Sequence, residues 1–162
     1  MNQHITVKLG ANGKTVEYDA IYFGAARKRC WGTVSRGAIK SNKNGVLMAK
    51  ERESPRLFIR SCGTAESKRD VNRMTTECIG NGATVLTDMG GAFNDTASIT
   101  GGEHKTVCYS NWFVDPQTGV HTNGIEGMNT HLKMFLKFMS NSFAKSERAL
   151  WGNIGRFVWR QW

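Results

Sequence analysis

Apolar and polar residues alternate along the first third of the chain with the period of two that is typical of β-strands. The clearest example is Thr15–Phe23, where Glu17 and Asp19 share one face of the expected strand and Tyr18 lies on the other. Two more strands are predicted at residues 46–51 and 56–62, with Ser54-Pro55 as the turn, and a loop at residues 27–44. Together the strands predict a three-stranded antiparallel meander.

Beyond residue 63 the apolar residues recur at helical spacing or form short apolar runs. Thr64 is a candidate cap for a helix over residues 65–79, which Gly80-Asn81-Gly82 would end. The remaining expected elements are a buried strand at 83–87, a short helix around 92–99, a strand at 105–109, a loop at 111–123, a helix at 124–139, and a last helix capped by Ser142 or Ser146. This order predicts an α/β fold with a mixed sheet flanked by helices.

Length and composition agree with one globular domain. The 162 residues are 40% hydrophobic and 22% charged, which is enough to bury a core without disulfides or a structural metal. No apolar run approaches the ~18 residues needed to span a bilayer, and no secretory signal is visible. We therefore expect an intracellular protein with no membrane partner.

The cysteines do not form a zinc-binding pattern. No two of them lie within three residues of each other, and none sits at metal-finger spacing from a histidine. They are Cys30, Cys62, Cys78 and Cys108. We interpret them as small buried side chains in a reducing compartment.

Positive charge is concentrated in one segment of the chain. The net charge is +9, and residues 25–60 carry ten Lys or Arg against two Glu. Such a segment suits a polyanion, most simply nucleic acid. A solvated basic surface that only keeps the protein soluble is the alternative.

Three carboxylates stand at positions where chemistry can occur. Asp19 lies within an otherwise apolar and aromatic strand, Asp88 ends the apolar strand at 83–87, and Glu126 begins an amphipathic helix. Each has a structural explanation: a bulge, a turn, and a favourable helix dipole. Taken together, and without a Cys or His ligand pattern, they favour hard cations such as Mg²⁺ or Mn²⁺.

The helix that starts near Glu126 carries further polar residues on one face. Asn129 and Lys133 follow Glu126 by three and seven residues, so the three side chains share a face over two turns. A metal-binding carboxylate followed by a cation suits a phosphodiester lying across this face. An ordinary polar helix face is the alternative.

These motifs resemble the catalytic domain of Merlin-type DDE transposases and their bacterial insertion-sequence relatives. The most specific block is FVDPQTGVHTNGIEGMNTHLK, residues 113–133, and TVEYDAIYFG (15–24) and VLTD (85–88) precede it in the family's order. The resemblance covers residues 14–160. It implies an RNase H-like fold in a single catalytic domain, 1–162, and no amino-terminal end-recognition module is expected. One departure is Ala20, where the family usually has an acidic residue directly after the first Asp.

The resemblance also implies roles for individual residues. Asp19, Asp88 and Glu126 match the Asp-Asp-Glu triad, which would hold two Mg²⁺ or Mn²⁺ ions for phosphoryl transfer. Lys133 matches the basic residue that follows the Glu. Supporting positions are His104, His121 and Asn123, with Asn129 on the helix face; the expected phosphate contacts are Lys133, Lys137, Arg27, Lys28 and Arg29, followed by Arg148, Arg156 and Arg160.

The function implied is that of a DNA transposase acting on double-stranded DNA, at transposon ends and target, as a homo-oligomer. The expected location is the nucleus in a eukaryotic host and the cytoplasm in a bacterial one. The main alternative is an exapted or inactive core that binds DNA without catalysis. A junction-resolving nuclease is a second alternative, and an RNA-binding domain with Trp31 and Trp112 as stacking platforms is a third.

Overall fold

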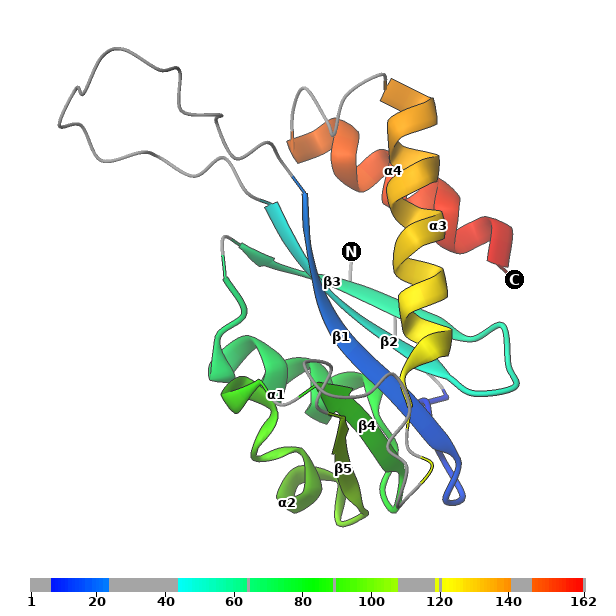
Figure 1. The fold of residues 1–162 in the computed structure, drawn as a ribbon. Coiled ribbons are helices and arrows are strands. Elements are labelled where there is room, and N and C mark those ends of the chain that lie inside the picture. The colour runs from blue at the N-terminus through cyan, green and yellow to red at the C-terminus, as the bar shows by residue number, and fades with distance from the viewer. Residues whose placement is uncertain are drawn as a thin grey trace, which may run out of the picture.

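The computed structural model describes residues 7–23, 44–63, 65–88, 90–107, 119, 121–140 and 147–161. Within these residues five strands form one mixed sheet (Figure 1): β1 (Thr15–Phe23), β2 (Asn44–Glu51), β3 (Leu57–Gly63), β4 (Thr84–Asp88) and β5 (His104–Val107). The strand order is β3-β2-β1-β4-β5, with β1, β2 and β3 antiparallel and β4 and β5 parallel to β1. The predicted meander and mixed α/β sheet are therefore confirmed.

Helices occupy both faces of this sheet. They are α1 (Lys68–Cys78), the 3-10 turn η1 (Gly91–Phe93), α2 (Thr96–Thr100), α3 (Asn123–Ser140) and α4 (Glu147–Gln161). The helix expected at 124–139 is confirmed within one residue at each end, whereas the short helix expected around 92–99 is divided into η1 and α2. The loop at 27–43, most of the loop at 111–123 and the caps proposed at Thr64, Ser142 and Ser146 lie outside the described residues.

Helix α1 begins later than the sequence pattern predicts. The Ser67 hydroxyl accepts a hydrogen bond from the Asp70 N–H at 3.1 Å and donates to the Asp70 carboxylate at 2.6 Å. This reciprocal cap satisfies a backbone N–H that would otherwise be unpaired at the helix start. The helix therefore starts at Lys68 rather than at residue 65, and its buried face is formed by Val71, Met74 and Cys78.

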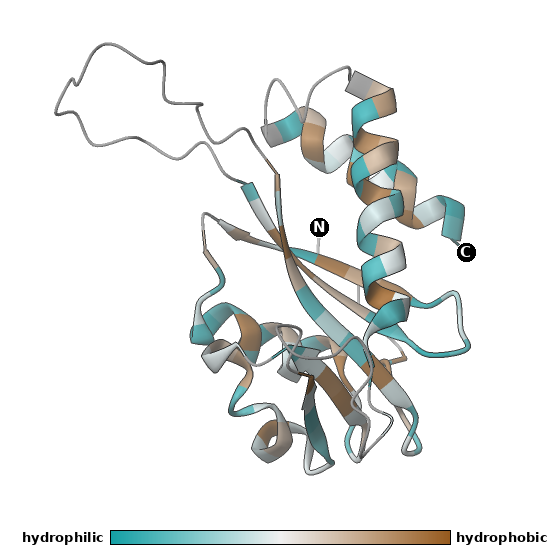
Figure 2. Ribbon diagram, in the orientation of Figure 1, coloured by the Kyte–Doolittle hydropathy of each residue, from teal (hydrophilic) through white to brown (hydrophobic). Residues whose placement is uncertain are grey.

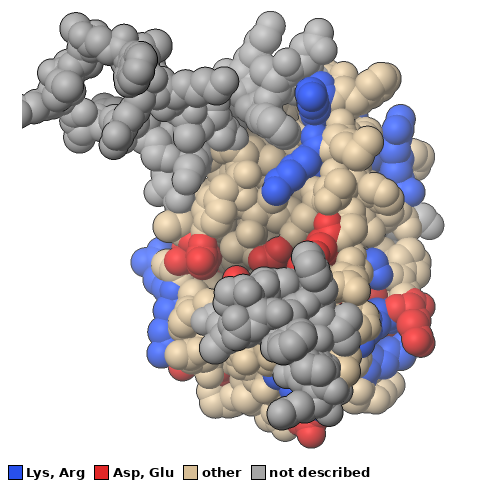
Figure 3. Space-filling model, in the orientation of Figure 1, with Lys and Arg blue, Asp and Glu red and all other residues tan. Residues whose placement is uncertain are grey.

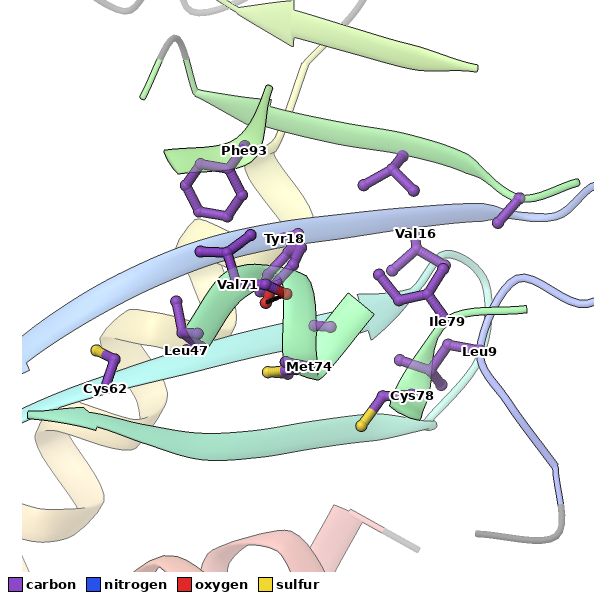
Figure 4. Close-up of a cluster of buried hydrophobic side chains, with 13 residues drawn as sticks. Leu9, Val16, Tyr18, Leu47, Cys62, Val71, Met74, Cys78, Ile79 and Phe93 are labelled. Carbon is purple, nitrogen blue, oxygen red and sulfur yellow. Dashed lines mark hydrogen bonds between the residues drawn. The ribbon is translucent and has the colours of Figure 1, made fainter. Parts of the chain in front are cut away.

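The alternation along β1 divides the interior into two cores. On one face, Val16 and Tyr18 pack with Leu47 of β2 and with Met74 of α1 (Figure 4). The Tyr18 and Phe93 rings also pack in a T-shaped arrangement, with the ring centroids 5.0 Å apart. This face of the sheet is therefore covered by α1 and η1.

The opposite face of β1 carries Ile21 and Phe23, which pack against α3 and α4. From α3 the core receives Ile125, Leu132 and Leu136, all essentially inaccessible to solvent. In Figure 2 both helices show alternating hydrophobic and hydrophilic residues, as expected of helices with one buried stripe. Glu17 and Asp19 belong to this face, so the sheet turns both carboxylates towards α3.

Two of the four cysteines lie in the described part of the chain. Cys62 and Cys78 are both buried free thiols, and burial raises the pKa of each to about 11. They are therefore inert apolar side chains, as the sequence predicts. Among the described residues no helix is both long and apolar enough to cross a membrane.

Candidate functional site

Three neighbouring elements bring the predicted carboxylates towards one another. Asp19 lies in the middle of β1, and Asp88 is the last residue of β4, which pairs with β1 in parallel. Glu126 lies in the first turn of α3, which packs on the same face of β1 that carries Asp19. In Figure 3 acidic side chains lie across the middle of the face shown, below the Lys and Arg side chains on its upper part.

The pKa of Asp19 reflects the nearby carboxylates. Its pKa is raised from 3.8 to about 6, mainly by burial, and the negative charges of Asp88 and Glu126 raise it further. Hydrogen bonds from Ala20 and Asn129 partly oppose this rise. A carboxylate whose ionisation is disfavoured by two like charges is typical of sites that bind a cation.

Hydrogen bonds fix the orientation of two of the three carboxylates. Asp19 accepts one from the Ala20 N–H at 2.7 Å and one from Asn129 Nδ2 at 2.6 Å. Asp88 accepts one from the Gly90 N–H at 3.0 Å. Asn129 is only 8% exposed, and its buried Oδ1 has no hydrogen-bond partner within the described part of the chain. The Asn129 side chain therefore donates to Asp19 and also carries an oxygen that could accept a further hydrogen bond.

None of the ion pairs among the described residues involves Asp19, Asp88 or Glu126. The buried carboxylates elsewhere on the sheet do have ion-pair partners. Glu17 pairs with Arg52, and Glu51 pairs with both Lys14 and Arg56. Burying a carboxylate without a cation is costly, so the fold neutralises its structural carboxylates and leaves the candidate site uncompensated.

The three carboxylates do not form a metal-binding site in the conformation described. Within the described residues, no three His, Cys, Asp or Glu side chains are placed to hold a metal ion together. The convergence of Asp19, Asp88 and Glu126 on one metal therefore stays a prediction. What the structure provides is a set of oxygen donors on three elements, which is the donor type that Mg²⁺ and Mn²⁺ prefer.

The two predicted supporting histidines make hydrogen bonds near the site. His104 Nε2 lies 2.8 Å from the Thr87 hydroxyl, which itself donates to the Asp88 carbonyl at 2.6 Å, so His104 must donate through Nε2. Burial lowers the pKa of His104, which favours this neutral form. His121 accepts from Arg52 through its carbonyl oxygen at 2.5 Å, and Asn123 is the exposed first residue of α3.

Two residues beside the site were not singled out by the sequence. Glu17 is 2% exposed and accepts a hydrogen bond from the Ile125 N–H at 2.5 Å. Arg52 donates to Glu17 through Nε at 2.6 Å. The sequence contained a signal for Glu17, because it is a charged residue in an apolar strand, which is the feature that identified Asp19. It also shares a face of that strand with Asp19. Arg52 gave none, because it lies in a segment rich in basic residues.

The basic residues expected to contact DNA divide into two groups. Lys133 and Lys137 are exposed on α3, as are Arg148, Arg156 and Arg160 on α4; Arg160 also lies over the Phe135 ring at 5.4 Å. By contrast, three arginines of the basic segment pair with carboxylates of the chain: Arg52 and Arg56 with the buried Glu17 and Glu51, and Arg60 with the exposed Glu77. Part of that segment's charge therefore serves the fold. Arg27, Lys28 and Arg29 lie outside the described residues.

Comparison with known proteins identifies the family. The ISXO2-like transposase domain matches residues 10–160 of the chain. The chain belongs to this family. The resemblance to transposases, inferred above from residues 113–133, is thus confirmed. A comparison with curated proteins gave no match.

Solved structures place this transposase domain in a known fold. It is similar to the HTLV-2 integrase catalytic core domain in complex with magnesium, in dimeric form, with a TM-score of 0.53 and 12% identity over 93% of this chain and 85% of that one. This likeness confirms the RNase H-like fold. The Mos1 strand transfer complex is also similar, with a TM-score of 0.42 and 13% identity over 91% of this chain and 52% of that one.

Proposed function

We propose that this transposase domain cuts and joins DNA phosphodiesters by two-metal-ion phosphoryl transfer, with Asp19, Asp88 and Glu126 as the metal ligands. The observation that carries the proposal is the uncompensated charge of these carboxylates. They come from three elements, two of them raise the pKa of the third, and none has an ion-pair partner in the described chain. This arrangement favours a site that a cation completes.

The donor set fits the proposed metal. Carboxylate oxygens suit a hard cation, and the unpartnered Asn129 Oδ1 beside Asp19 offers a further acceptor for a metal or its bound water. When bound in pairs, such ions activate water or a DNA 3′-hydroxyl for in-line attack and stabilise the leaving oxygen. The protein itself would orient the ligands: Asn129 holds Asp19, while Thr87 and His104 hold the backbone of Asp88.

The proposed substrate is double-stranded DNA at transposon ends and target. Its backbone would lie along the exposed polar face of α3, where Lys133 and Lys137 follow the carboxylates. Those lysines neutralise phosphates and thereby supply affinity without reading sequence. The family supports this proposal, because its matching domain is that of a transposase, and the similar integrase catalytic core was solved with magnesium. We further propose that the domain acts as a homo-oligomer, in the nucleus of a eukaryotic host or the cytoplasm of a bacterial one.

The test combines metal titration with product analysis. Mn²⁺ titration of the DNA-free protein is expected to show saturable binding, and a plasmid incubated with protein and Mn²⁺ is expected to be nicked and to receive a labelled duplex with a free 3′-hydroxyl. Chelation with EDTA should stop both reactions. Nicking without joining would instead favour a nuclease. DNA binding with no Mn²⁺ binding would favour the non-catalytic core and would overturn the proposal.

Replacing Lys133 by alanine is expected to weaken DNA binding without impairing Mn²⁺ binding. Lys133 lies two helical turns beyond Glu126, about 10 Å along α3, which suits a phosphate beside the metals. Losing one phosphate contact should lower the slope of log K against log salt by about 0.9.

The matched control for this prediction is Lys68→Ala. Lys68 is also exposed, but it lies on α1, on the opposite face of the sheet, and pairs with Asp95 at 2.9 Å. Its removal should leave the salt slope unchanged. DNA affinities measured at several salt concentrations compare the two variants, and equal slopes for Lys133→Ala and wild type would leave Lys133 without a phosphate contact.

A further inference from the structure

The helix that carries Glu126 begins on a side chain from another element. The Thr122 carbonyl accepts the first helical hydrogen bond, from the Glu126 N–H at 3.1 Å, so Thr122 is the N-cap of α3. An N-cap hydroxyl usually accepts from the N–H two or three residues later. Here Glu17 of β1 accepts from the Ile125 N–H at 2.5 Å, and the buried Thr122 hydroxyl has no partner among the described residues. The helix start is therefore fixed by the sheet and not by its own cap.

A second contact ties the same carboxylate to the segment that leads into α3. Arg52, just after β2, donates to Glu17 through Nε at 2.6 Å. The same guanidinium donates to the His121 carbonyl at 2.5 Å, and the Arg52 backbone N–H donates to the Thr15 carbonyl at 2.9 Å. Glu17 and Arg52 thus join β1, the end of β2 and the start of α3 in one cluster around the buried Glu17 carboxylate.

The spacing of the contacts aligns α3 with β1. Glu17 bonds Ile125, and Asp19, two residues further along the strand, bonds Asn129, four residues further along the helix. Two strand residues span about 6.6 Å and four helical residues about 6 Å, so the two hydrogen bonds are in register. Glu126 lies between these two points of attachment. Its position relative to Asp19 therefore depends on both.

The approach of the helix to Glu17 requires a glycine. A Cβ atom at Gly124 would lie 2.7 Å from Glu17 Oε2 and 3.1 Å from Oε1. Real Cβ atoms essentially never lie under 3.0 Å from another atom, so any side chain at position 124 must move the helix start or the carboxylate. Gly124 otherwise lies at the exposed surface of the helix.

We propose that Glu17 and Arg52 are positioning residues that set the separation of the Asp19 and Glu126 carboxylates and so the metal affinity of the site. This inference rests on the proposed function. In this proposal the pair binds neither metal nor DNA and acts by holding the first turn of α3. Residues that orient metal ligands in this way change metal affinity or activity by roughly 10–100-fold when replaced.

The experiment compares Glu17→Gln with Glu51→Gln. Both carboxylates are buried, with 2% and 1% exposure, both pair with arginine, and both accept a backbone N–H, but Glu51 holds Gly10 whereas Glu17 holds α3. In Glu17→Gln the new amide would turn a donor towards Arg52 or Ile125. Hydrogen exchange of the metal-free protein is expected to be at least about ten-fold faster in the first turn of α3 in Glu17→Gln only. Mn²⁺ affinity should fall roughly 10–100-fold in that variant and stay unchanged in Glu51→Gln.

Gly124→Ala is a second test that keeps the buried ion pair. Alanine favours a helix, so the variant should fold, while its Cβ displaces the helix start from Glu17. It should reproduce the faster exchange and the weaker Mn²⁺ binding. Should Glu17→Gln fail to fold, Gly124→Ala decides alone.

The outcomes separate the inference from the function on which it rests. If wild type binds Mn²⁺ and both variants bind it equally well, with unchanged exchange in α3, the inference is wrong and the proposed function stands. If Glu51→Gln loses Mn²⁺ affinity to the same extent as Glu17→Gln, the effect is one of general stability and the inference is likewise wrong. If wild type binds no Mn²⁺, the proposed function fails, and the exchange rates alone support or overturn the tethering of α3.

Discussion

Replacing Asp19 by asparagine is expected to abolish strand cleavage and, at neutral pH, to make the metal-free protein more stable. Asp19 is a proposed metal ligand, so its loss should lower the cleavage rate by roughly 10³-fold or more, equal to ~4 kcal/mol of transition-state stabilisation. DNA affinity should change little, because it depends on the basic surface. An inactive variant that gains stability is hard to explain by misfolding.

The gain in stability follows from the raised pKa of Asp19. A folded-state pKa of about 6, against 3.8 ordinarily, means that the folded protein holds a proton that the unfolded chain has released between these pH values. The free energy of unfolding therefore falls as pH rises from about 4 to 6, and the deficit persists above pH 6. At full effect it is roughly 3 kcal/mol, and partial solvent access to Asp19 reduces it to about 1–2 kcal/mol.

Asparagine at this position removes the charge and can keep both hydrogen bonds. Asn129 can rotate its amide and accept from the new side chain through Oδ1, which has no partner among the described residues of the wild type. Asp19→Asn should thus be about 1–2 kcal/mol more stable than wild type at pH 7.5 and no more stable at pH 4. Urea unfolding at the two pH values, without metal, measures this. A difference that is the same at both pH values would show that the charge of Asp19 is not its origin.

How much of the fold and of the site the sequence predicts depends on how far apart in the chain the interacting residues lie. Periodicity in β1 and α3 predicts the strand and helix and the two faces of β1, because the packing of Ile21 or Leu132 is set by local spacing. The three candidate carboxylates were likewise visible, since a charge in an apolar strand or at a strand end is unusual wherever its partner lies. Local sequence patterns do not predict which residues far apart in the chain pair with each other.

Helix α3 illustrates this limit. Thr122 is a good local cap, yet the helix start is held by Glu17, 108 residues earlier than Ile125 in the chain. Arg52 looks like one more phosphate-binding residue in a basic segment, yet it is committed to Glu17 and His121. A sequence shows that a charge is present but not whether the fold has already neutralised it, so the basic segment overstates the charge available to DNA.

Replacing Arg52 by leucine is expected to be the most destabilising of the changes considered for this protein. It leaves the Glu17 carboxylate, 2% exposed, without its cation, and removes the hydrogen bond to the His121 carbonyl. Breaking a buried ion pair from one side costs about 3–5 kcal/mol, a large part of the total stability of a small domain. The arginine is 30% exposed, so we expect a loss of about 3 kcal/mol, measured by urea unfolding.

Two comparisons identify the cause of that loss. The double variant Glu17→Gln/Arg52→Leu removes the stranded charge and should recover at least half of the lost stability, because most of the cost lies in the unpaired carboxylate. Arg56→Leu makes the same change beside Glu51, which keeps Lys14 at 3.2 Å and the Gly10 N–H at 2.9 Å. It also removes the hydrogen bonds that Arg56 donates to the Val7 and Lys8 carbonyls, so it should cost about 2 kcal/mol, still less than Arg52→Leu. If the double variant is as unstable as Arg52→Leu, the arginine acts by packing, and the charge of Glu17 is not what it neutralises.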